Sequence, residues 1–130
     1  MKKQVRINNT PICQARIRGL NDAMEILSGK WKFYILGTLI GGGQLRFMDL
    51  LREVEGIGPK MLSKELQDLE MNRIVSRTVL STKPITVVYE LTELGKTLEP
   101  VLNAIAHWGI DYRREMLSGA SDRKISDGID

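Results

Sequence analysis

The segment from Arg46 to Leu91 constrains the fold of this chain more than any other part of the sequence. A helix with one apolar face is predicted at Arg46–Glu53, because apolar residues recur there and just beyond it at helical spacing: Phe47, Leu50, Leu51 and Val54. The sequence Glu55-Gly56-Ile57-Gly58 predicts a tight turn, because glycine permits positive φ. Pro59 then suits the first position of a second helix, where its missing N–H costs nothing.

Two β-branched runs follow the second helix, which is predicted at Pro59–Met71. They are separated by Ser81-Thr82-Lys83-Pro84, a sequence typical of the tip of a hairpin. The order helix, glycine turn, helix and hairpin predicts a winged helix-turn-helix. The fold class is therefore mainly α with a small antiparallel β-hairpin, flanked by N- and C-terminal helices available for dimerisation.

The second helix of this motif would carry an apolar stripe and an opposite polar face. The stripe consists of leucines at helical spacing: Leu62, Leu66 and Leu69. The polar face consists of residues at the same spacing on the other side: Lys60, Ser63, Lys64 and Gln67. A helix fits the major groove of B-DNA, where lysine can donate to guanine and glutamine matches adenine. This face is therefore predicted to read DNA.

Further basic residues are predicted to contact the phosphate backbone without reading sequence. Arg46 lies at the start of the first motif helix, Arg77 lies on the hairpin and Lys83 lies at its tip. Lys30 and Lys32 are additional candidates. The formal net charge of +3 and the isoelectric point near 9.1 permit a polyanionic partner without requiring one.

Outside the motif, the chain is predicted to form one domain at 15–117, between a mobile polar arm at 1–14 and a disordered tail at 118–130. A long helix is predicted to open at the Thr92-Glu93 cap. It has more apolar positions than one small core can cover. We predict that a second copy of the chain buries the following residues: Ile17, Leu20, Met24, Leu102, Ile105, Gly109, Tyr112 and Met116.

Such a homodimer would place its two reading helices about one DNA turn, roughly 34 Å, apart on an inverted repeat. The alternative is that all these apolar positions belong to the core of one monomer. For the function, the alternative to DNA binding is a winged-helix protein–protein interaction module, in which the basic face would be dispensable.

An enzyme, a cofactor and a metal site are not expected. No serine or cysteine has an evident base in the sequence pattern, and one histidine, His107, with one cysteine, Cys13, does not form a metal-ligand cluster. A lone cysteine also cannot form an internal disulfide, so a cytoplasmic location is expected. The sequence has no apolar run of the roughly 18–20 residues needed to span a membrane, so no membrane partner is expected.

Three stretches resemble the HxlR-type branch of bacterial winged-helix transcription regulators, which is related to the MarR group. They are SGKWKFYIL at 28–36, LRFMDLLREVEGIGPKMLSKELQDLE at 45–70 and VVYELTELGKTLEPVL at 87–102. The resemblance covers about residues 18–110 and implies a homodimer, packed through its terminal helices, that binds an inverted-repeat operator. The hairpin tip and the start of the second helix match the family positions for DNA contact: Pro59, Lys60, Met61, Leu62 and Ser63.

One position departs from the family pattern. Members that sense electrophiles or oxidants carry a cysteine thirteen residues before the tryptophan of the first stretch, and Arg18 occupies that position here. Cys13 lies five residues earlier, so thiol sensing by the family route is not expected. A small-molecule effector could instead bind near Trp31, Tyr34 and Trp108, although aromatic residues packed in a core give the same pattern.

Overall fold

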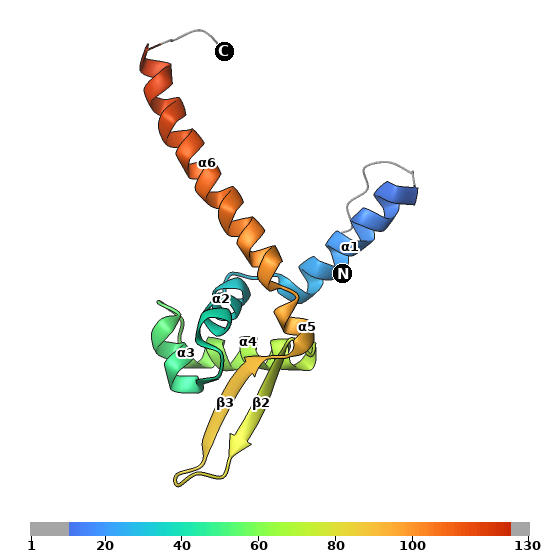
Figure 1. The fold of residues 1–130 in the computed structure, drawn as a ribbon, viewed down its shortest axis with the longest axis vertical. Coiled ribbons are helices and arrows are strands. Elements are labelled where there is room, and N and C mark those ends of the chain that lie inside the picture. Colours follow the sequence, from blue (N-terminus) through green and yellow to red (C-terminus); the bar gives the residue numbers. More distant parts are fainter. Residues whose placement is uncertain (1–10, 126–130) are drawn as a thin grey trace. The chain divides into compact units, whose positions relative to one another are not determined.

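The computed structural model describes residues 11–125 and is mainly helical (Figure 1). Its elements are α1 (Pro11–Leu27), α2 (Lys32–Gly42), β1 (Leu45–Arg46), α3 (Phe47–Glu53), α4 (Pro59–Met71), β2 (Val75–Leu80), β3 (Thr86–Leu91), α5 (Glu93–Lys96) and α6 (Glu99–Ile125). The chain divides into a first unit that ends at Lys96 and a second unit that begins at Thr97. Each unit is described by itself.

The predicted helix-turn-helix is present as α3 and α4. Gly56 has a φ of 91°, a conformation that residues with a side chain rarely adopt, and it lies in the turn between the two helices. Pro59 occupies the first turn of α4, as its fixed φ and missing N–H favour. The fold class predicted from the sequence is therefore confirmed.

The wing is part of a three-stranded antiparallel sheet with the order β1-β3-β2. Strands β2 and β3 form the predicted hairpin, paired from Val75↔Leu91 at its base to Leu80↔Thr86 at its tip. The sequence pattern predicts only these two strands. The third, β1, is just two residues long and pairs Leu45 with Tyr89. A segment this short has no alternating pattern that could reveal it in the sequence.

The core of the first unit lies where α2, α3 and α4 meet the sheet. Its fully buried side chains come from each of these layers: Ile35, Leu36, Leu39, Leu50, Leu62, Leu66, Leu69 and Val75. All three leucines of the predicted α4 stripe are among them. Burying one such side chain contributes about 1.5–3 kcal/mol, so this cluster fixes α4 firmly on its apolar side.

The predicted long helix after Thr92 is divided into α5 and α6. The Thr92 hydroxyl accepts the Gly95 N–H at 2.9 Å, which confirms the predicted N-cap. However, Pro100 has no N–H to donate to the carbonyl of Lys96, and its ring would clash with that carbonyl in a continuous helix. The chain therefore interrupts the helix after Lys96 and starts α6 at Glu99. The prediction of one uninterrupted helix was wrong for this reason.

Two helices extend beyond their predicted limits. Helix α1 begins at Pro11, so residues 11–14 of the predicted arm are helical, and α6 reaches Ile125, so residues 118–125 of the predicted tail are helical. These segments lack a periodic apolar face, which predicts irregular structure, but they extend helices that are already formed, and propagation of a helix costs less than its nucleation. The rest of the predicted arm, 1–10, and of the predicted tail, 126–130, lie outside the described residues.

Candidate nucleic-acid interface

Helix α4 exposes the polar face that the sequence predicted. The side chains of this face are exposed, together with that of Met61: Lys60, Ser63, Lys64 and Gln67. They project from the side opposite the buried leucine stripe, because residues three and four apart share a helix face. The core thus holds α4 by one side and leaves two turns of donors and acceptors exposed to solvent.

A hollow of about 350 Å³ joins this helix face to the wing. Its lining residues are Ser63, Gln67, Glu70, Arg77 and Tyr89. Arg77 and Tyr89 are directly paired across β2 and β3, so their side chains leave the same face of the sheet. Three of the predicted contact residues, Ser63, Gln67 and Arg77, are therefore brought together although they come from different elements.

Glu70 and Tyr89 were missed by the sequence analysis. The helical spacing offered a signal for Glu70, because it lies three residues after Gln67 and seven after Ser63. Tyr89 had no comparable local signal, since it reaches the hollow only through the pairing of β3 with β2. A carboxylate at this position can accept a hydrogen bond from cytosine N4, which makes Glu70 a further candidate for base contact.

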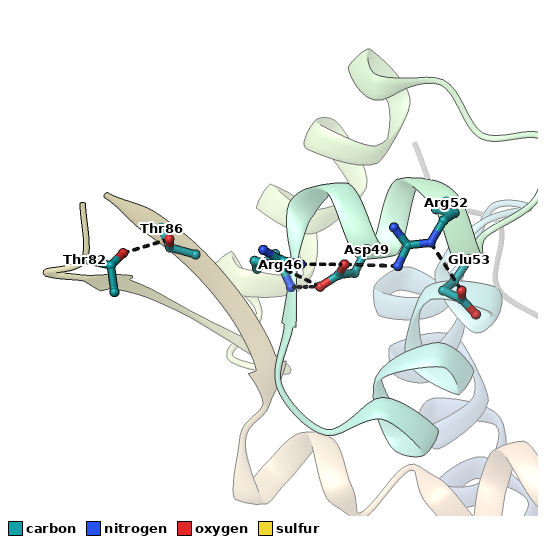
Figure 2. Close-up of polar contacts among 6 residues, drawn as sticks. All are labelled: Arg46, Asp49, Arg52, Glu53, Thr82 and Thr86. Atoms are coloured by element: carbon teal, nitrogen blue, oxygen red, sulfur yellow. Dashed lines mark hydrogen bonds and ion pairs between the residues drawn. The ribbon is translucent and has the colours of Figure 1, made fainter. Parts of the chain in front are cut away.

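Two arginines at the start and the end of α3, the N-cap Arg46 and Arg52, share one carboxylate, as Figure 2 shows. Arg46 Nε donates to Asp49 Oδ2 at 3.2 Å, and Arg52 Nη2 donates to Asp49 Oδ1 at 3.1 Å. The Arg46 backbone N–H also donates to Asp49, at 3.1 Å, which satisfies one of the free donors at the start of the helix. The two guanidinium groups remain exposed and have a preferred orientation.

The Asp49 carboxylate titrates far from its ordinary range. Its pKa falls from 3.8 to about 2, chiefly because the Arg46 side chain donates to the charged form, with the Arg46 N–H and Arg52 adding to the effect. The same contact raises the pKa of Arg46. The predicted contact residue Arg46 is therefore a permanent cation at the junction of β1 and α3, and Arg52, which we had not predicted, lies beside it.

The tip of the wing is held by its own threonines. The Thr82 hydroxyl donates to the Pro84 carbonyl at 2.7 Å and lies 2.8 Å from the Thr86 hydroxyl, the contact drawn in Figure 2. The Lys83–Pro84 peptide bond is cis. Lys83 is exposed at this tip, as predicted for a backbone contact, and the neighbouring Ile85 is 70% exposed.

The two additional lysine candidates have different positions. Lys30 is exposed, and its Nζ lies 4.7 Å from the centre of the Trp31 ring. Lys32 is only 7% exposed, and its Nζ donates to the Glu65 carboxylate of α4. The prediction that Lys32 contacts DNA was therefore wrong, because its amine is turned into the protein and paired there.

Helix α6, in the second unit, exposes apolar side chains along its length. None of its side chains described between 99 and 119 is buried in the isolated chain. Trp108 is 67% exposed and stacks on Tyr112 with ring centres 5.1 Å apart. The predicted dimer residues of α6 are exposed or half-buried: Leu102, Ile105, Gly109, Tyr112 and Met116. The structure of one chain thus leaves this apolar surface uncovered.

The predicted dimer residues of α1 divide into two groups. Leu20 and Met24 are half exposed, as a partner surface requires. Ile17 is buried within the chain itself, so it is already covered and does not fit the predicted role. Helical spacing places Ile17, Leu20 and Met24 on one side of α1. Only the tertiary structure decides which of these side chains is covered within the same chain.

The predicted effector region contains a second hollow, of about 510 Å³, in the first unit. Trp31 and Tyr34 line it, with their ring centres 6.2 Å apart, beside Lys30, Glu53 and Glu55. Trp108 lies on α6, in the second unit.

Cys13 is half-buried and His107 is exposed. Among the described residues, no three potential ligands are grouped to hold a metal ion.

None of the helices within 11–125 combines the length and the hydropathy needed to span a membrane.

The same chain matches known proteins in sequence and in structure. Residues 26–116 match the model of the HxlR-like helix-turn-helix family. An uncharacterised HTH-type transcriptional regulator of Methanothermobacter thermautotrophicus is 39% identical over 90 residues, which cover 69% of this chain and 68% of that protein. The HTH-type transcriptional regulator YdeP of Bacillus subtilis, also uncharacterised, is 36% identical over 106 residues, which cover 82% of each protein.

A solved structure shows the same arrangement. The redox regulator HypR in its reduced form superposes with a TM-score of 0.70 and 34% sequence identity, covering 77% of this chain and 98% of that one. The two sequence relatives are regulators of transcription rather than enzymes.

Proposed function

Because this chain belongs to the HxlR-like helix-turn-helix family of DNA-binding transcription regulators, we propose that it reads an inverted-repeat operator as a homodimer. In this proposal α4 enters the major groove and the wing contacts the backbone beside it. The observation that carries the proposal is the continuous polar surface from Lys60 to Gln67, which runs into the hollow shared with Arg77.

The residues of α4 suit the reading of base edges. Lys60 and Lys64 are donors for guanine O6 and N7, Gln67 can pair with adenine, and Ser63 can serve either base. Met61, also exposed near the start of α4, supplies an apolar contact of the kind that a thymine methyl group accepts. All five side chains lie in the first two and a half turns, where a reading helix approaches the bases.

The backbone contacts in this proposal come from the elements on either side of α4. Arg46, which caps the start of α3, and Arg52 of α3 hold exposed guanidinium groups, and Arg77 and Lys83 lie on the wing. Arginine suits phosphate because its planar fork can donate two parallel hydrogen bonds. These contacts would fix the register of α4 on the duplex without reading its sequence.

The second copy is proposed because of the apolar surfaces left exposed on α6 and α1. An isolated chain would expose the Trp108–Tyr112 stack and the neighbouring Ile105 and Met116 to water, which is unfavourable for a contiguous apolar surface. A twofold dimer buries the same surface of both copies and places two reading helices in successive turns of the groove.

Selection of bound duplexes from a random pool would test this proposal, because it returns the site, its symmetry and its half-site spacing together. We expect a palindromic site whose half-sites lie about one helical turn apart. With the selected duplex, the change Lys60→Ala with Lys64→Ala should lower affinity by about a hundredfold, since each base contact contributes roughly 1–3 kcal/mol. The plot of log affinity against log salt should become less steep.

Lys96→Ala is the matched control, since Lys96 is an exposed lysine of α5 that pairs with Glu93. It removes one positive charge, against two in the double variant, without touching α4, and should leave affinity nearly unchanged. The proposal would be contradicted if the selection recovers no duplex, or if the control lowers DNA affinity as much as the double variant does. Capture of a protein partner that survives the loss of Lys60, Lys64 and Lys83 would instead support an interaction module.

A further inference from the structure

A buried carboxylate lies on the inner side of the reading helix. Glu65 of α4 is only 5% exposed and lies among the leucines of the buried stripe. A charge in such a place is costly unless another charge compensates it. Lys32 of α2, which is 7% exposed, donates from Nζ to Glu65 Oε1 and provides that compensation across the core.

The same lysine reaches a second carboxylate of α4. Lys32 Nζ donates to Asp68 Oδ2 at 3.4 Å, and Asp68 is half-buried at the edge of the core. On its outer side, the same Oδ2 atom lies 3.6 Å from Nζ of Lys64, which is a candidate base contact. Asp68 is therefore shared between an inner amine, which stays in the protein, and an outer amine, which faces solvent.

This sharing matters because of the charge of α4 itself. The helix carries two lysines, Lys60 and Lys64, and three carboxylates, Glu65, Asp68 and Glu70, so it has one excess negative charge. A helix that approaches phosphates with uncompensated carboxylates would be repelled. Lys32 offsets this excess from behind the helix, where it does not compete for space in the groove.

We infer that Lys32 is a positioning residue for DNA recognition: it holds α4 through Glu65 and balances Asp68 when Lys64 turns from Asp68 to the duplex. The inference rests on the proposed function, since it requires the outer face of α4 to bind DNA. The exposed Lys64–Asp68 pair is weak and can exchange. Lys32 lowers the cost of that exchange, because Asp68 keeps a cationic partner when Lys64 leaves it.

A purely structural role for Lys32 predicts a different result, and the double replacement Lys32→Met with Glu65→Leu separates the two. It removes one positive and one negative charge, so the net charge of the protein is unchanged. Replacing a buried ion pair by apolar residues of similar volume is often neutral or stabilising, so we expect thermal unfolding near that of the unmodified protein. If Lys32 only holds the helix, DNA affinity should then also be retained.

We instead expect the double variant to bind the selected duplex about tenfold more weakly, the size of one charge-assisted hydrogen bond. Adding Asp68→Asn should recover most of this loss, because Lys64 is then no longer held by an unbalanced carboxylate. In the unmodified background, Asp68→Asn should raise affinity by a smaller factor. The matched control is Lys96→Met with Glu93→Leu, which removes the exposed pair of α5 and should leave affinity unchanged.

Affinity retained in the double variant, with the same effect of Asp68→Asn in both backgrounds, would overturn the inference. If the double variant does not fold, Lys32→Met with Glu65→Gln tests the same point while preserving the side-chain volume at position 65. The proposed function would fail separately, by absence of duplex binding in the unmodified protein. Binding that depends on Lys60 and Lys64 but not on Lys32 would remove only this inference.

Discussion

Helices α4 and α6 expose opposite kinds of surface. Helix α4 buries a complete apolar stripe in the core of its unit and exposes polar and basic side chains. Helix α6 has no buried side chain between 99 and 119, and it exposes Trp108, Tyr112 and several aliphatic residues. A helix that is already packed can use its free face for polar recognition, whereas a helix without a core of its own must find apolar contacts elsewhere.

The comparison separates two sources of stability. The order of α4 depends on contacts within one chain, so it should be independent of protein concentration. The burial of the apolar face of α6 depends, in our proposal, on a second chain and therefore on concentration. Changes at matched residue types on the two helices should consequently differ in size and in concentration dependence.

The largest effect is expected for Leu66→Ala in the buried stripe of α4. The change leaves a cavity in a packed core and should lower the free energy of unfolding by about 2–5 kcal/mol. Urea unfolding at two protein concentrations would measure it. The matched control is Leu117→Ala, which removes the same atoms from a side chain of α6 that is 65% exposed. Equal losses in the two variants would show that the two helices do not differ as described.

A comparable but concentration-dependent effect is expected for Trp108→Ala on α6. Exposed tryptophans that become buried at an interface often contribute more than 2 kcal/mol, so the dimer dissociation constant should rise by on the order of a hundredfold. Sedimentation equilibrium would measure this. Ile85→Ala on the wing is the control, because Ile85 is equally exposed but lies outside α6. A monomeric unmodified protein, or an unchanged constant, would contradict the proposed interface.

A smaller effect is expected for Arg77→Ala on the wing. Loss of one phosphate contact should weaken binding by about tenfold on every duplex sequence and reduce the salt slope by about one. Binding assays with selected and mismatched duplexes over a salt series would measure it. Arg113→Ala, at an exposed arginine of α6, is the matched control. A loss confined to one base pair would instead show that Arg77 reads sequence through the α4 hollow.

The smallest effect is expected for Asp49→Asn on α3, and it should depend on pH. The pKa of Asp49 is lowered from 3.8 to about 2 in the folded protein, so the ionised form favours folding above pH 4. This contribution is lost as pH falls from about 4 to about 2. The stability difference between the unmodified protein and the variant should therefore shrink over that interval in thermal unfolding experiments.

Arg46→Gln should remove much of the same pH dependence, because Arg46 is the main cause of the lowered pKa. Parallel stability curves for the unmodified protein and Asp49→Asn from pH 2 to pH 5 would show that the Arg46–Asp49 contact does not persist in solution.

Much of the reading region could be predicted because its signals are local. Gly56 and Pro59 define the turn and the start of α4, and leucines at helical spacing define its buried side. The same stripe also contains a signal for the buried ion pair: Glu65 lies three residues after Leu62 and four before Leu69, so helical geometry places it on the buried side. A charged residue at such a position indicates a partner, but its identity does not follow from the spacing.

The sequence by itself determined the order helix, turn, helix and hairpin, the limits of α4 and the residues of its exposed face, because helix periodicity and the backbone restrictions of glycine and proline act over a few residues. Only the tertiary structure decided that Lys32 meets Glu65, 33 residues away, that β1 joins the sheet and that Arg77 shares a hollow with Ser63 and Gln67. These contacts depend on how distant segments approach one another, and no local pattern specifies that approach.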